Sequence, residues 1–122
     1  MRSETFEDLV DQALAELPLR LAGYLDNVEV VVEDWPTSRH AESLGLARGE
    51  TLYGLYEGVP LTERSAHYSL VMPDKITVFR GPILQAHRSV ASVREQVRQT
   101  VIHELAHHFG IDDDRLIALD AY

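Results

Sequence analysis

The apolar residues of positions 5–17 recur every three or four residues, which is the spacing of an amphipathic helix. Thr5 and Asp8 resemble a capping box at its start, and the early acidic residues suit the positive end of a helix. Pro18 ends this helix and can occupy the first turn of a short second one that reaches Leu25. The pattern therefore predicts two N-terminal helices, and the first buries one stripe, made of Phe6, Leu9, Val10, Ala13, Leu14 and Leu17.

Runs of β-branched and aromatic residues, bounded by Gly and Pro, predict the strands. The runs cover residues 27–33, 51–57 and 75–80, with a further extended segment at 68–72. Residues 38–44 fit one or two helical turns, whereas residues 58–67 are polar and rich in turn formers, which indicates a loop. The middle of the chain thus predicts a small sheet, and the Gly-Pro pair at 81–82 ends its last strand.

A long helix is predicted at residues 92–109, with Ser92 and Glu95 as its capping pair, and a short helix at 115–119. One face of the long helix is apolar and should meet the core, and the opposite face is polar. The apolar face holds Val101, Ile102, Leu105 and Phe109, and the polar face holds Gln96, Gln99, Thr100, His103 and His107. Helices, then strands, then this helix predict an α+β (mixed α/β) fold in which a short twisted sheet is backed by helices.

The polar face of the long helix carries the pattern His-Glu-x-x-His at positions 103–107, which is the zinc-protease signature when it lies on a helix. His103 and His107 project from the same face about one turn apart, so their imidazoles can converge on one metal ion. Glu104 is rotated by about 100° from His103. This position suits a general base that reaches a water beside the metal better than it suits a ligand. Five consecutive residues therefore offer two ligands and one base.

Gly110 and the aspartates after it extend the pattern to H-E-x-x-H-x-x-G-x-x-D, the metzincin-type arrangement with aspartate in place of the third histidine. Glycine ends a helix by adopting positive φ, so the chain can turn back and bring a third ligand to the metal. A catalytic zinc takes three protein ligands and leaves one position open for water. No glutamate follows Glu104, so a downstream ligand must be an aspartate. Spacing favours Asp113, and the other candidates are Asp112, Asp114 and Asp120. Each aspartate of the run at 112–114 could instead cap the helix that follows.

The other histidines and the tyrosines have no comparable spacing. His108 lies about 140° around the helix from His103, so we interpret it as a packing or solvated residue. The remaining histidines and three tyrosines are more simply explained as core or surface residues than as groups that stabilise a tetrahedral intermediate. They are His40, His67, His87, Tyr53, Tyr56 and Tyr68.

Length, charge and composition limit the class of protein. With 122 residues, the chain is predicted to form a single domain over residues 1–122. It contains no cysteine, so any metal must be held by histidine and carboxylate groups. The net charge of -9 and the scattered basic residues argue against a nucleic-acid partner. Because neither a signal peptide nor an apolar run of membrane-spanning length is recognisable, we expect a cytoplasmic protein without a membrane partner.

The sequence resembles the small bacterial zincin-like metallopeptidases, a family also described as minimal zincins. The resemblance covers most of the chain and rests on residues 52–58 (LYGLYEG), residues 73–82 (PDKITVFRGP) and, above all, residues 100–115. It implies a short mixed sheet backed by an N-terminal helix and by the helix that carries the motif. It also implies a Zn²⁺ ion held by His103, His107 and Asp113, with Glu104 as the general base.

The resulting hypothesis is a zinc-dependent metallopeptidase that hydrolyses a peptide or protein substrate with a metal-activated water. Two alternatives come from other functional classes. One is a metal-binding interaction domain without catalytic activity. The other is an RNA-cleaving zincin relative, against which the acidic charge counts. The pattern identifies neither a specificity pocket nor an oligomeric interface.

Overall fold

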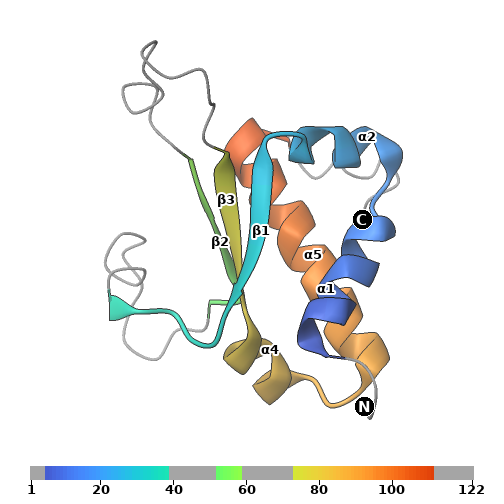
Figure 1. The fold of residues 1–122 in the computed structure, drawn as a ribbon, viewed down its shortest axis with the longest axis vertical. Coiled ribbons are helices and arrows are strands. Elements are labelled where there is room, and N and C mark those ends of the chain that lie inside the picture. The colour runs from blue at the N-terminus through green and yellow to red at the C-terminus, as the bar shows by residue number, and fades with distance from the viewer. Residues whose placement is uncertain (1–4, 39–51, 59–72, 112–122) are drawn as a thin grey trace.

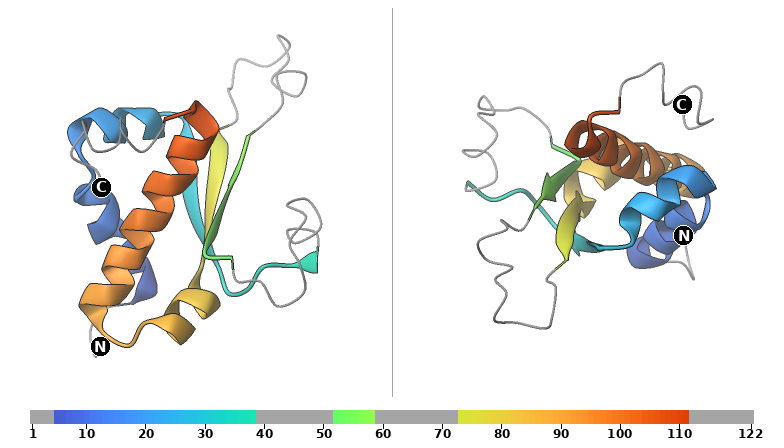
Figure 2. Two further views of the ribbon diagram at one scale, coloured as in Figure 1. Left: turned by 180° about the vertical axis from the view of Figure 1, so that it is seen from behind. Right: turned by 90° about the horizontal axis from the view of Figure 1, so that it is seen from above.

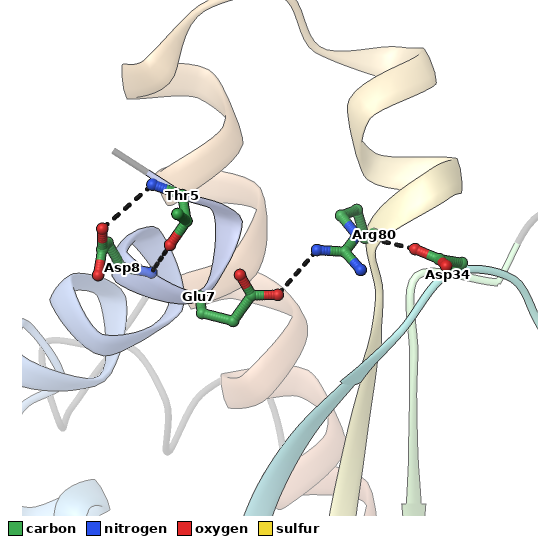
Figure 3. A network of polar contacts seen from close by, with 5 residues as sticks. All are labelled: Thr5, Glu7, Asp8, Asp34 and Arg80. Carbon is green, nitrogen blue, oxygen red and sulfur yellow. Dashed lines mark hydrogen bonds and ion pairs between the residues drawn. The ribbon is translucent and has the colours of Figure 1, made fainter. Parts of the chain in front are cut away.

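The first helix begins at the predicted cap. In the computed structural model, which describes residues 5–38, 52–58 and 73–111, helix α1 (Phe6–Ala15) follows Thr5. The Thr5 hydroxyl accepts a hydrogen bond from the Asp8 amide at 3.1 Å, and the Asp8 carboxylate accepts one from the Thr5 amide at 3.1 Å (Figure 3). The short helix α2 (Leu19–Ala22) and the 3-10 turn η1 (Gly23–Leu25) then follow Pro18. Both predicted N-terminal helices are therefore confirmed.

Three strands form a small mixed sheet in the part of the chain that the structure describes. They are β1 (Val28–Glu33), β2 (Gly54–Glu57) and β3 (Asp74–Phe79). The order is β1-β3-β2, so the last strand lies in the centre, parallel to β1 and antiparallel to β2. Among the described residues, β2 is an edge strand. The predicted α+β class and the short mixed sheet are confirmed.

Helix α4 (Arg80–Ala86) was not predicted, although its first turn contains the Gly-Pro pair that ends β3. Proline is tolerated in the first turn of a helix because the amide it lacks has no partner within the helix there. The Gly81 amide donates to the Asp34 carbonyl at 2.7 Å, which anchors this turn to the segment after β1. The Gly-Pro pair was therefore correctly interpreted as the end of a strand and missed as the start of a helix.

The long helix α5 (Val90–Phe109) begins earlier than predicted. Its cap is Ser89, which forms a reciprocal capping box with Ser92, and the predicted cap Ser92 is already inside the helix. Glu95 binds the Arg98 guanidinium at 2.8 and 3.0 Å and takes no part in capping. The end of the helix is as predicted, because Gly110 adopts the left-handed conformation with φ 68° and ψ 31°.

The core lies between the sheet and the helices, since α1, α2 and α5 cover the same face of the sheet (Figures 1 and 2). Most of its fully buried members come from α1, β3 and α5, among them Leu9, Ala13, Ile76, Val78, Val97, Val101 and Leu105, and α2 and α4 add Leu21 and Ile83. Two assignments on α5 were wrong. Thr100 is only 6% exposed, whereas Phe109 is 43% exposed. The Phe109 ring packs instead on Tyr24, with ring centroids 4.7 Å apart.

A guanidinium group ties three elements together at one end of the fold. Arg80, the first residue of α4, binds Asp34 beyond β1 and Glu7 in the first turn of α1, each at 2.8 Å (Figure 3). All three side chains are partly or well exposed, so each pair contributes little to stability. The network fixes the relative positions of these element ends more than it adds to the free energy of folding.

Several predictions fall on residues outside the described ranges. These are nearly all of the helical turns at 38–44, most of the loop at 58–67, the extended segment at 68–72 and the helix at 115–119. His40, His67, Tyr68, Asp112, Asp113, Asp114 and Asp120 lie there as well. Within the described ranges, none of the helices has the length and apolar character needed to cross a bilayer.

Candidate metal and catalytic site

The two histidines of the motif lie on the exposed face of α5, one turn apart. His103 and His107 are both exposed, and residues 102, 105 and 106 between and beside them are buried. Burial of Ile102, Leu105 and Ala106 against the core fixes the rotation of the helix about its axis. The two imidazoles therefore project on one side, as helical geometry requires for a shared metal ion.

Glu104 lies next to this exposed face and points toward the edge strand. Its carboxylate oxygen Oε1 accepts a hydrogen bond from the Tyr56 amide of β2 at 2.9 Å. Burial raises the pKa of Glu104, because desolvation disfavours the charged form. The Tyr56 hydrogen bond and the charges of His107 and His103 oppose this shift but do not cancel it. The motif carboxylate is thus a half-buried base beside two exposed imidazoles.

The raised pKa of Glu104 predicts a pH-dependent stability in chelator-treated protein. A carboxyl whose folded pKa is raised stabilises the fold below its unfolded pKa, and this contribution is lost as pH rises through the folded pKa. Replacing Glu104 by glutamine removes the cost of burying the charge. We expect Glu104→Gln to raise the melting temperature near pH 7 and to lose that advantage near pH 4, about the unfolded pKa of glutamate.

Glu95 on the same helix provides a control of opposite sign for this melting experiment. The hydrogen bond from Arg98 lowers the pKa of Glu95, so its contribution is present at neutral pH and is lost as pH falls. Glu95→Gln should therefore lower the melting temperature at pH 7. Equal responses of the two variants across the pH range would contradict the assignment of Glu104 as a desolvated carboxylate.

Gly54 brings the edge strand close to the motif helix. A Cβ atom at this position would lie 2.4 Å from Cγ2 of Thr100 and 3.9 Å from Cγ of Glu104. Thr100 is buried one turn before Glu104, so the helix cannot easily give way. Glycine inside a strand commonly marks such an approach of two backbones. The absence of a side chain at position 54 allows the Tyr56 amide to reach Glu104.

Gly54→Ala is expected to destabilise the protein by about 1–3 kcal/mol, because the added methyl group overpacks the contact with Thr100. Thr100→Ser removes Cγ2 but keeps the hydroxyl that accepts from Gln96 at 3.1 Å. The double variant should therefore recover part of the loss in a urea unfolding experiment. Full stability of Gly54→Ala alone, or no recovery in the double variant, would show that the strand and helix are not in close contact.

His108 does not join the other two histidines. Its ring stacks on Tyr56, with centroids 3.9 Å apart and planes 13° apart, which agrees with the prediction of a packing role. Among the remaining candidates, His87 lies 3.0 Å from Oε1 of Gln96, and the Tyr56 hydroxyl donates to Asp74 at 2.6 Å. Sequence reasoning missed both Asp74 and the Tyr56 amide. Gly54, a glycine inside the strand, was the signal in the sequence that could have indicated this contact.

The predicted third ligand lies beyond the described residues. Gly110 turns the chain, the Ile111 amide donates to the Ala106 carbonyl at 2.8 Å, and the Ile111 side chain is buried. The turn expected before the aspartates is therefore present. Within residues 5–38, 52–58 and 73–111, no three histidine or carboxylate groups come together as a metal site. The donor types that are described, two exposed imidazoles with a carboxylate beside them, fit a zinc site that takes its third ligand from elsewhere.

Comparisons with known proteins identify a family and a similar fold. A family described as zincin-like metallopeptidase matches residues 25–122. The fold is similar to that of a conserved hypothetical protein from T. thermophilus, with a TM-score of 0.54 and 24% sequence identity. The alignment covers 86% of this chain and 91% of that one. No curated protein matches the sequence. At this identity, the similarity of the solved structure concerns the fold alone.

Proposed function

We propose that this chain, which belongs to the zincin-like metallopeptidase family, is a zinc-dependent peptidase that acts on a peptide or protein substrate. One observation carries the proposal. Helix α5 presents two exposed imidazoles one turn apart and, beside them, a partly buried carboxylate held by the neighbouring strand. This is the combination of metal ligands and general base that metal-assisted hydrolysis requires.

The proposed ligands are His103, His107 and Asp113. The two imidazoles bind as neutral groups, and the left-handed Gly110 ends the helix before the aspartates from which the third ligand would come. When bound, zinc acts as a Lewis acid on the substrate carbonyl and makes water acidic enough to be deprotonated near pH 7. Asp112 and Asp114 remain the alternatives for the third position.

Glu104 is the proposed general base. Its carboxylate takes a proton from the attacking water and can pass that proton to the leaving amine. In the metal-free protein, burial raises its pKa, because desolvation disfavours the charged form. The Tyr56 amide occupies only one of its two oxygens. The second oxygen can therefore exchange the proton while the first stays bound.

Digestion of casein and of a peptide library tests the proposal, with products identified by mass spectrometry. Zinc-loaded protein should cleave at defined positions, and protein stripped with a chelator should not. Cleavage that persists after chelation would reject a metal-dependent mechanism. A large thermal stabilisation by zinc without any cleavage would instead support a metal-stabilised binding domain. Cleavage of structured RNA, with no effect on peptides, would support the ribonuclease alternative.

A further inference from the structure

The hydrogen-bonding pattern of β2 leaves the Tyr56 amide on the outer edge of the sheet that the described residues form. The Phe79 amide of β3 donates to the Tyr53 carbonyl at 2.9 Å, so Tyr53 and Phe79 form a hydrogen-bonded pair across the two strands. In an antiparallel ladder, hydrogen-bonded pairs alternate with pairs that are not hydrogen-bonded. The amides of Leu55 and Glu57 therefore point toward β3, and the amide of Tyr56 points away from it. An outward amide on an edge strand is normally open to water. Here it is bound to Glu104.

Tyr56 contacts the motif helix at two points one turn apart. Its amide binds Oε1 of Glu104 at 2.9 Å, and its ring stacks on His108 with centroids 3.9 Å apart. Glu104 and His108 are four residues apart and therefore lie on the same side of α5. Two contacts at adjacent turns fix both the distance between the strand and the helix and the position of the strand along the helix axis. A single contact would leave the position along the axis undefined.

Asp74 holds the Tyr56 side chain in this position. Tyr56 pairs with Ile76 across the sheet, so Asp74 is its diagonal neighbour on the same face. The Tyr56 hydroxyl donates to Oδ2 of Asp74 at 2.6 Å, and the Asp74 side chain is only 15% exposed. The same oxygen lies 3.9 Å from Nε2 of His108. Asp74, at the start of β3, thus closes a chain of contacts that leads through Tyr56 to the motif helix.

We propose that Tyr56 is a positioning residue for the general base and that Asp74 holds Tyr56 in place; the inference rests on the proposed peptidase function. The Tyr56 amide fixes Oε1 of Glu104, so that Oε2 keeps one orientation beside the two histidines. Catalytic groups lose much of their effect when they are misplaced by about 1 Å. Removing the Tyr56 hydroxyl releases the ring that stacks on His108 from Asp74, while all atoms of the site remain.

Amide hydrogen exchange on chelator-treated, full-length protein tests the contact without any need for activity. The amide of residue 56 should be protected in the wild-type protein, although it lies on an outer edge. In Glu104→Ala it should exchange about tenfold faster, the loss expected for one hydrogen bond. Tyr56→Phe and Asp74→Ala should give part of this effect. The amides of Leu55 and Glu57, which point toward β3, should not change.

Steady-state kinetics of the zinc-loaded protein test the consequence. Tyr56→Phe and Asp74→Ala should each lower kcat about tenfold with KM unchanged, as outer contacts of a metal site typically do. Asp74→Asn should restore most of kcat, because its amide oxygen still accepts the tyrosine hydroxyl. Tyr24→Phe is the matched control, since the Tyr24 ring packs on Phe109 at the end of the same helix. This control should keep the wild-type kcat.

Three results would overturn the inference. The first is a residue 56 amide that exchanges as fast in the wild-type protein as in Glu104→Ala. The second is a Tyr56→Phe variant with unchanged exchange and unchanged kcat. The third is an equal loss of kcat in Tyr56→Phe and Tyr24→Phe, which would indicate general loosening. If the wild-type protein hydrolyses no peptide, the proposed function fails, and the exchange experiment alone decides whether Tyr56 holds Glu104.

Discussion

Replacing Glu104 by glutamine is expected to lower peptide hydrolysis by about 10²–10⁴-fold while zinc stays bound. Glutamine has nearly the same shape, and its amide oxygen can still accept the hydrogen bond from the Tyr56 amide. It cannot take a proton from water, so only the base is removed. The measurement is kcat on one peptide substrate, together with the zinc content of the same sample by plasma mass spectrometry.

Glu95→Gln is the matched control for the loss of hydrolysis. Glu95 lies on the same helix, is exposed and binds Arg98, so the same chemical change there leaves the site untouched. This variant should keep both zinc and activity. Equal turnover in Glu104→Gln and the wild-type protein would remove Glu104 from the mechanism. Loss of zinc in Glu104→Gln would show that the carboxylate is needed for metal binding.

Replacing His103 by alanine is expected to abolish stoichiometric zinc binding. The wild-type chain should hold about one zinc ion, as expected for a three-ligand catalytic site. The loss of one ligand from such a set lowers the affinity strongly, because metal binding and ligand number are coupled. The thermal stabilisation that zinc gives the wild-type protein should disappear together with the metal.

His87→Ala is the control for this second prediction. His87 follows helix α4 and lies near the Gln96 side chain, so it shares the residue type but not the position. It should bind zinc like the wild-type protein. An unchanged zinc content in His103→Ala, or an equal loss in both variants, would mean that the metal is held elsewhere.

Local signals in the sequence predicted much of the fold. The Thr5 and Asp8 cap, the apolar stripe of α1 and the glycine at the end of α5 each depend on residues close together in the chain. The errors arose where two local signals competed. Only Ser92 was predicted as a cap, although Ser89 is the same residue type three positions earlier. A Gly-Pro pair can end a strand or begin a helix, and only the first was predicted. Local pattern alone did not select between these interpretations.

The arrangement of the strands could not be derived in the same way. The order β1-β3-β2 joins residues far apart in the chain, and β1 pairs with β3 in parallel while β2 pairs with it antiparallel. Register and order depend on how the helices cover one face of the sheet, which no single segment encodes. The resemblance to a family implied a mixed sheet, and the structure added the order and the register.

In the candidate site too, some features follow from local sequence and others depend on contacts between distant segments. His103 and His107 are four residues apart on a helix, so their shared side, with Glu104 beside it, was predictable from helical geometry. The contacts that hold Glu104 come from Tyr56 and Asp74, which lie on two other elements. Phe109 was placed in the core by its helical position, but it lies at the exposed end of α5 against Tyr24. Contacts between distant segments therefore determine the surroundings of the motif.

Anomalous scattering at the zinc absorption edge tests the central claim most directly, in crystals grown with zinc and without chelator. The account predicts one strong peak about 2.0–2.1 Å from a ring nitrogen of His103 and of His107, with the Glu104 carboxylate beside it. A strong peak at any other place, or fully ordered imidazoles that point apart with no peak between them, would contradict it.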